Sequence, residues 1–86
     1  MKIKKDLIKR QVAGDTILVP VGQSIYQSNG LFVLNDVGAF LWDLLPEAES
    51  AGDLCRSVVE AYEVEEETAM ADVQDFLEML RKLDMI

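Results

Sequence analysis

The sequence contains no histidine and a single cysteine among its 86 residues. Histidine is the usual general base near neutral pH and the commonest metal ligand, so its absence removes the most frequent catalytic and metal-binding arrangements. One cysteine excludes a disulfide framework and any zinc site built from several cysteines. No serine lies in a Gly-x-Ser-x-Gly or Ser-x-x-Lys setting. We therefore expect no catalytic residues, no metal site and no cofactor.

Basic residues are scarce, 8 against 16 acidic ones, and the net charge is −8. They are also unevenly placed: residues 1–15 carry a balance of +3, and residues 16–86 carry one of −11. A chain this acidic is repelled by nucleic acid phosphates and by anionic membrane surfaces. We expect neither nucleic acid nor a membrane as a partner.

Long hydrophobic runs are absent as well. No stretch approaches the roughly 18 unbroken apolar residues of a membrane span, and the N-terminus shows no secretory signal pattern. A cytoplasmic location is therefore the expectation. Half of the residues are apolar, and only five are glycine and two proline. This composition and length predict one folded domain over residues 1–86.

The first half of the chain predicts three short strands, because its apolar residues come in short blocks. We expect them at Leu7–Val12, Thr16–Val21 and Leu31–Leu34. Turn signals lie between them, Ala13-Gly14-Asp15 and Asn29-Gly30.

The apolar pattern also differs between the second and third strands. The second strand is rich in β-branched and apolar residues, and Ile17, Val19 and Val21 share one of its faces. The third strand is apolar at every position, which predicts that both of its faces are covered. In a simple meander it also lies at a sheet edge.

The second half predicts three helices. The first begins near Asn35 or Asp36, both good N-caps, and stops at Pro46. The second begins at Ser50, and the third runs from about Glu66 to Leu83. The fold class is therefore α+β, a winged-helix-like arrangement with a three-stranded antiparallel sheet followed by three helices.

Helical spacing selects the expected core residues of the first two helices. In the second helix Cys55 is expected to be a small buried apolar residue. The expected core stripes comprise Val37, Phe40, Leu41, Leu44 and Leu45 in the first helix and Leu54, Val58, Ala61 and Tyr62 in the second.

The third helix has an unusually wide apolar face. It covers an arc of about 140°, extended by Met79 to about 180°, whereas a single small core needs about 100°. Either the core wraps more of this helix, or one margin near Asp72, Phe76, Met79 and Leu83 is exposed and receives a partner. If that margin lies beside the edge of Leu31–Leu34, the two elements form a groove for an extended peptide.

Several segments resemble those of the PqqD-like proteins. Residues 29–35 (NGLFVLN) followed by residues 38–45 (GAFLWDLL) resemble the central signature of that family. Residues 69–80, with the pattern A-x-x-D-V-x-x-F-L-x-x-L, are similar to its C-terminal helix, and residues 17–20 (ILVP) to its second strand.

This resemblance implies a non-catalytic precursor-peptide recognition domain. Such domains bind the leader segment of a ribosomally made peptide and present the peptide to a modifying enzyme, often a radical-SAM maturase. The leader adds as a strand to the third strand and packs against the third helix. The implied strand contacts are Leu31, Phe32, Val33 and Leu34, and the implied helix contacts are Ala69, Asp72, Val73, Phe76 and Leu80. Of these, Val73 and Leu80 are also candidates for a purely structural role.

One segment departs from the family pattern. Proteins of the pyrroloquinoline quinone pathway tend to have an Asp-Gly pair and a helix-starting Thr after the first helix, whereas residues 45–50 are LPEAES here. The departure favours the broader PqqD-like group, whose peptide products vary.

Two other classes of protein stay open. One is a winged-helix DNA-binding regulator, against which the acidic third helix argues. The other is an acidic carrier protein, which needs an Asp-Ser-Leu attachment site that neither Ser50 nor Ser57 provides. An exposed edge strand also leaves a homodimer open.

Overall fold

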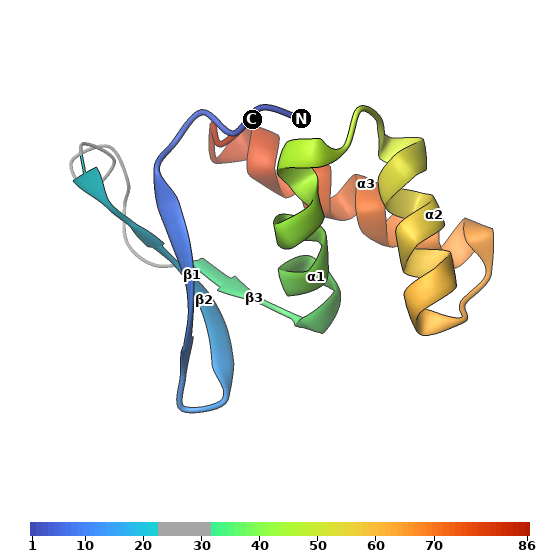
Figure 1. The fold of residues 1–86 in the computed structure, drawn as a ribbon, viewed down its shortest axis with the longest axis horizontal. Coiled ribbons are helices and arrows are strands. Elements are labelled where there is room, and N and C mark those ends of the chain that lie inside the picture. The colour runs from blue at the N-terminus through green and yellow to red at the C-terminus, as the bar shows by residue number, and fades with distance from the viewer. Residues whose placement is uncertain (23–31) are drawn as a thin grey trace.

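The computed structural model of the chain describes residues 1–22 and 32–86. Within them an antiparallel sheet of order β1-β2-β3 is followed by three α-helices, as the sequence predicts. Figure 1 shows the sheet on one side of the molecule and α2 on the other, with α1 between them. The elements are β1 (Leu7–Val12), β2 (Asp15–Pro20), β3 (Phe32–Leu34), α1 (Asp36–Leu44), the 3-10 turn η2 (Leu45–Glu47), α2 (Ala51–Tyr62) and α3 (Glu66–Lys82).

The β1-β2 hairpin turns on two residues. Val12 pairs with Asp15, so Ala13 and Gly14 form the loop, and both have positive φ, 52° and 85°. This matches the type I′ turns whose twist suits a hairpin. The predicted turn is thus confirmed, with Asp15 belonging to β2. The strand ends at Pro20, which has no N–H to donate to a ladder. The expected Asn29-Gly30 turn lies outside the described residues.

The two faces of β2 are buried to different degrees. Thr16 and Leu18 are buried, whereas Ile17, Val19 and Val21 are only half-buried. Both faces of this strand are apolar, so alternation alone does not indicate which face the helices cover. The helices cover the face that carries Leu18, and the face shared by Ile17, Val19 and Val21 lies on the other side of the strand.

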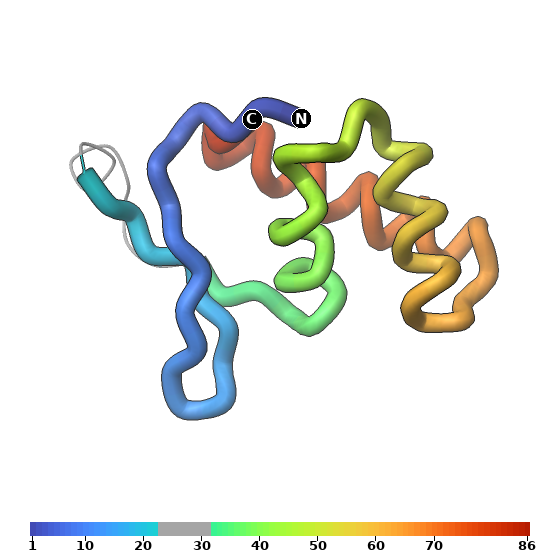
Figure 2. Tube along the Cα trace, viewed as in Figure 1, coloured from blue at the N-terminus to red at the C-terminus, as the bar shows by residue number. Residues whose placement is uncertain are grey.

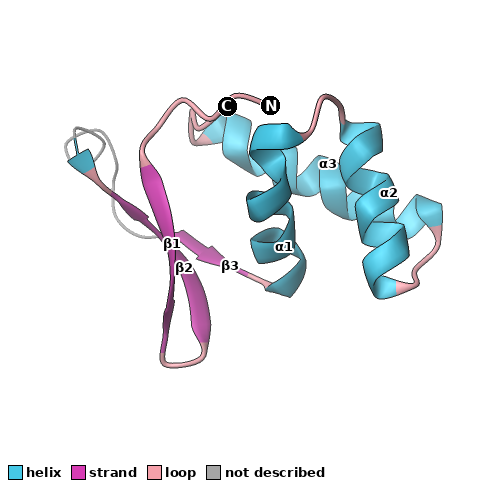
Figure 3. Cartoon of the chain, viewed as in Figure 1, coloured by secondary structure: helices cyan, strands magenta, loops and turns pink. Residues whose placement is uncertain are grey.

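The expectation that β3 is covered on both faces is also wrong. Leu34 is buried, but Val33, on the opposite face, keeps 66% of its surface exposed. Val33 pairs with Ile17 of β2 and lies on the same sheet face as Ile8 and Val12 of β1, which are exposed too. No helix packs on this face within residues 1–22 and 32–86. Antiparallel sheets commonly leave one face to the solvent, and that face is usually polar, whereas this one carries apolar residues. Figure 3 shows α1, α2 and α3 to one side of the strands.

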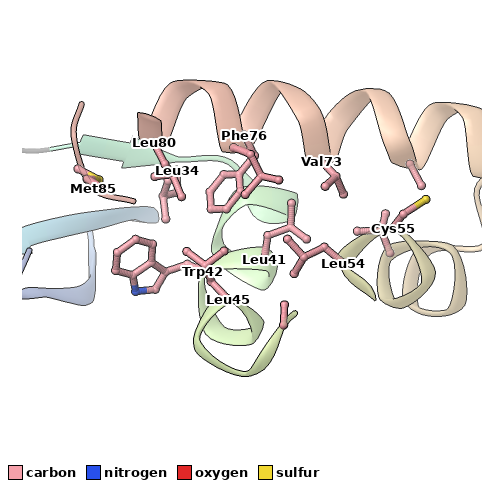
Figure 4. Packing of buried hydrophobic residues seen from close by; sticks show 14 of the residues in the cluster. Leu34, Leu41, Trp42, Leu45, Leu54, Cys55, Val73, Phe76, Leu80 and Met85 are labelled. Atoms are coloured by element: carbon pink, nitrogen blue, oxygen red, sulfur yellow. The ribbon is translucent and has the colours of Figure 1, made fainter. Parts of the chain in front are cut away.

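Helix α1 begins where the sequence predicts. Asn35 is its N-cap, and the Gly38 N–H donates to Asn35 Oδ1 over 2.7 Å. Pro46 lies in the 3-10 turn that ends the helix. The buried face is rotated from the predicted stripe, because α1 packs on the sheet as well as on the other helices. Figure 4 shows Trp42 on the side of the strands and Leu41 beside Leu54 of α2. The buried residues are Gly38, Leu41, Trp42 and Leu45, whereas Val37, Phe40 and Leu44 are half-buried.

Helix α2 is capped by Ser50, whose Oγ accepts from the Asp53 N–H over 3.4 Å. Leu54, Cys55 and Val58 are buried, so the expected burial of the cysteine is confirmed. The last turn leaves the core, and the predicted core residues Ala61 and Tyr62 are exposed. The Tyr62 ring instead meets Phe40 of α1 edge-on, with ring centroids 5.4 Å apart.

Helix α3 packs against α1 and α2 and ends in a hydrogen-bonded cap. Asp84 adopts a left-handed conformation with φ 57°, its N–H donates to Arg81 O, and the Met85 N–H donates to Leu80 O over 2.8 Å. This is the Schellman arrangement, in which an apolar residue beyond the cap packs back on the helix. Met85 is accordingly fully buried, although it is the penultimate residue.

The N-terminal segment runs alongside this cap. The Lys4 N–H donates to Met85 O over 2.6 Å, and Lys5 Nζ donates to Leu83 O over 2.9 Å. Figure 2 shows the two ends of the chain next to each other. None of the helices in residues 1–22 and 32–86 has the length and hydropathy needed to span a membrane.

Candidate functional site

Strand β3 lies at an edge of the sheet formed by the described residues. In the part of the chain that the structure describes, it pairs with β2 alone. Successive residues of a strand direct their N–H and C=O groups to opposite sides, so an edge strand presents unpaired backbone groups to the solvent. Strand β1 forms the other edge of the sheet. The two edges differ in charge, because β1 carries Lys9 and Arg10 whereas β3 carries no charged residue.

A groove lies beside the β3 edge, between this strand, the start of α1 and the second half of α3. It encloses about 260 Å³. Its lining residues are Val33, Leu34, Asn35, Val37, Gly38, Leu41, Asp72, Asp75, Phe76 and Met79.

The floor of the groove is apolar. Leu34, Leu41 and Phe76 are buried in the core beneath it, and Val37 and Met79 are half-buried. In the close-up of Figure 4, Phe76 of α3 lies close to Leu34 of β3 and above Leu41 of α1. The groove floor therefore consists of core residues at the edge of the sheet.

Gly38 allows α1 to approach the strand. A Cβ placed on Gly38 would lie 3.1 Å from Asn35 Oδ1, the atom that caps the helix, and 3.6 Å from the Leu34 side chain. A larger residue would therefore press on the cap and narrow the groove. Residues 34, 37, 38 and 41 form one wall of the groove. The first belongs to β3, and the spacing of the other three places them on the same side of α1.

Two carboxylates form the rim on α3. Asp72 and Asp75 are exposed and lie one helical turn apart. The ion pairs among the described residues lie elsewhere: Lys4 with Asp84, Lys9 with Asp43, and Lys82 with Glu78. The groove therefore combines a free backbone edge, an apolar floor and an acidic rim.

The structure brings four of the predicted site residues together and leaves the others apart. Val33, Leu34, Asp72 and Phe76 line the groove, whereas Phe32 is half-buried against the core. Leu31 lies outside the described residues. The remaining three, which are fully buried and do not line the groove, are Ala69, Val73 and Leu80.

Sequence reasoning missed most of the α1 wall and half of the acidic rim. Asn35, Val37, Gly38, Leu41 and Asp75 line the groove but are absent from the predicted set. A usable signal exists on α3, since positions 72, 75, 76 and 79 share one helical face. The α1 residues carried no such signal, because which face of α1 meets the strand is decided by packing.

The described residues hold no cluster of three or more metal-ligating side chains among histidine, cysteine, aspartate and glutamate. Within residues 1–22 and 32–86 the groove thus presents backbone, apolar side chains and two carboxylates, and it can bind a chain segment of matching shape.

The fold and the groove define a small α+β domain with an open sheet edge beside an apolar groove. The family model described as coenzyme PQQ synthesis protein D (PqqD) matches residues 16–86. The chain belongs to this family, so the resemblance predicted from the sequence is confirmed. None of the curated proteins matches the chain.

One similar solved structure is that of TbiB1 in complex with the TbiA(beta) leader peptide. The two chains are 24% identical, the match covers 99% of this chain and 93% of that one, and the TM-score is 0.73. At this identity the likeness shows that the fold is shared. The α+β prediction, with an antiparallel sheet followed by three helices, is confirmed, and the likeness to a winged helix stays a prediction.

Proposed function

We propose that this protein binds the leader segment of a ribosomally made precursor peptide. The leader adds as a strand to the free edge of β3 and places alternate side chains in the groove against α3. The protein itself is not an enzyme, and it presents the bound peptide to a modifying enzyme such as a radical-SAM maturase.

The observation that carries this proposal is the juxtaposition of a free strand edge and an apolar groove. Main-chain hydrogen bonds to an edge strand provide affinity for any extended peptide, and pockets for alternate side chains provide selectivity. Here the exposed edge of β3 and the groove floor at Phe76 and Met79 are adjacent. A peptide strand on β3 therefore has side chains within reach of α3.

The charge difference between the two sheet edges supports the choice of β3. Charged side chains on an edge strand discourage pairing with another chain. Lys9 and Arg10 protect β1 in this way, and Lys9 forms an ion pair with Asp43 of α1. Strand β3 has no such protection, so strand addition is favoured at the groove side of the sheet. The same asymmetry disfavours a homodimer formed through β1.

Two comparisons support the identity of the guest. The chain belongs to the PqqD family, and TbiB1, which shares its fold, was solved with a leader peptide. Dependence on a separate modifying enzyme agrees with the sequence, which offers no histidine and no cysteine pair for chemistry of its own.

The test selects binders from a displayed library of random peptides about 15 residues long, which exceeds an ordinary strand. The selected peptide is then titrated by calorimetry. Met79→Ser should weaken binding at least about tenfold, because it removes part of the apolar floor of the groove and the contacts that a guest makes there. Met70→Ser is the matched control, since Met70 is also half-buried on α3 but lies outside the groove.

A second variant addresses the strand edge. Val33→Pro removes a backbone N–H from β3 and should also abolish binding. Circular dichroism must show that this variant is folded. Phe76 is unsuitable as a probe because it is 7% exposed, so its truncation would destabilise the fold. The proposal fails if the library yields no binder, or if Met79→Ser and a folded Val33→Pro variant bind as the wild type does.

A further inference from the structure

We propose that the peptide that occupies the groove carries a lysine or arginine facing Asp72 and Asp75, and that these two carboxylates determine which peptides bind. This inference rests on the proposed function and extends it to the chemistry of the guest. It makes Asp72 and Asp75 specificity-determining residues.

The two carboxylates are placed to meet a bound strand. They are three residues apart on α3, they share a helix face, and both line the groove with Phe76 and Met79. Both are exposed to solvent while the groove is empty. A strand on β3 would run between them and the edge.

No cation of the described residues neutralises these carboxylates. The lysine on the same helix, Lys82, pairs with Glu78 over 3.3 Å. Asn35 is the other polar side chain in the lining, and its Oδ1 already accepts the Gly38 N–H. The groove therefore presents two carboxylates that form no ion pair with the described residues, and they lie beside its apolar floor.

The whole molecule strengthens this preference. With a net charge of −8, it attracts basic peptides and repels acidic ones before contact. The stems of lysine and arginine are apolar, so such a residue can lie along Met79 and still reach a carboxylate with its charged end. A neutral guest would leave the two carboxylates to water, and an acidic guest would be repelled.

Strand geometry predicts the spacing in the guest. Side chains that face the same side of a strand are two residues apart. An apolar residue that fills the floor at Phe76 and a basic residue that meets Asp72 or Asp75 should therefore be separated by one residue. The expected pattern is apolar-x-basic or its reverse, depending on the direction of the guest.

The inference is tested with the same displayed random library, selected in parallel on three proteins. These are the wild type, Asp72→Lys/Asp75→Lys, and the control Glu49→Lys/Glu60→Lys. The control makes the same change in net charge at exposed residues outside the groove. Wild-type and control selections should enrich the apolar-basic pattern, whereas the groove variant should lose it or enrich acidic residues instead.

The affinities provide a second readout. A wild-type-selected peptide should bind the groove variant roughly tenfold more weakly at low salt, and the difference should shrink as salt is raised. Replacing its basic residue with glutamate should restore binding to the groove variant. The inference is overturned if the selected peptides show no preference for basic residues, or if the control variant loses this preference as much as the groove variant does. Either result leaves the proposed function standing. A library that yields no binder overturns both.

Discussion

At the scale of single residues, Ala13 holds a backbone conformation that its side chain disfavours. It is the first of the two loop residues of the β1-β2 hairpin and has a φ of 52°. For a residue with a Cβ, the left-handed region costs about 1–2 kcal/mol, and asparagine tolerates it better than alanine because its side chain bonds locally. Strand pairing therefore stabilises the hairpin although the Ala13 side chain disfavours the backbone conformation of the turn.

We predict that Ala13→Asn raises the free energy of unfolding by about 0.5–1 kcal/mol, because Asn-Gly is the favoured pair for such turns. Urea denaturation monitored by circular dichroism measures the change. Ala13→Val is the control and should destabilise, since a β-branched side chain is least compatible with positive φ. An asparagine variant no more stable than the wild type would show that the turn is unstrained.

At the scale of elements, the cap of α3 adds to the core a residue that lies beyond the helix itself. Met85 follows the helix, returns its N–H to Leu80 O and is fully buried beside Leu80. Figure 4 shows Met85 near Leu34 and Leu80, at the sheet end of the core. The cap therefore joins α3 to the sheet.

We predict that Met85→Ala lowers the free energy of unfolding by about 2–4 kcal/mol, the usual cost of truncating a buried long side chain. Chemical denaturation measures it. Ile86→Ala, at the neighbouring half-buried position, is the control and should cost less. If both variants match the wild type, the terminal residues do not belong to the core in solution.

At the scale of the whole molecule, the N-terminal segment connects the sheet to the helices. Besides the bonds of Lys4 and Lys5 to the α3 cap, Ile3 packs against the core. The segment is also the positively charged part of an otherwise acidic chain, and Lys4 forms an ion pair with Asp84.

We predict that deleting residues 1–4 lowers the free energy of unfolding by roughly 2–3 kcal/mol through lost apolar burial and hydrogen bonds. Thermal melting followed by circular dichroism measures the loss. Lys2→Ala, an exposed position in the same segment, should leave the melting temperature unchanged. Peptide binding by the folded fraction should persist, since residues 1–4 do not line the groove. Loss of binding without loss of stability would place the segment in the site.

Much of the fold was predictable because its signals are local. The two-residue turn at Ala13-Gly14, the caps at Asn35 and Ser50 and the stop at Pro46 each satisfy or interrupt backbone hydrogen bonds within a few residues. These signals fixed the order and the approximate bounds of the elements. Most of the α3 side of the groove followed from the same logic, since the margin of α3 at Asp72, Phe76 and Met79 is a property of helical spacing.

The amino-acid sequence by itself determined the order of the strands and helices and, to within a residue or two, their bounds, because turns, caps and apolar periodicity act over a few residues. Only the tertiary structure decided that Leu18 rather than Ile17 faces the helices, that Gly38 and Leu41 wall the groove, and that Met85 enters the core. When both faces of a strand or helix are apolar, its own residues favour burial of either face equally. The elements that pack against it then determine which face is buried.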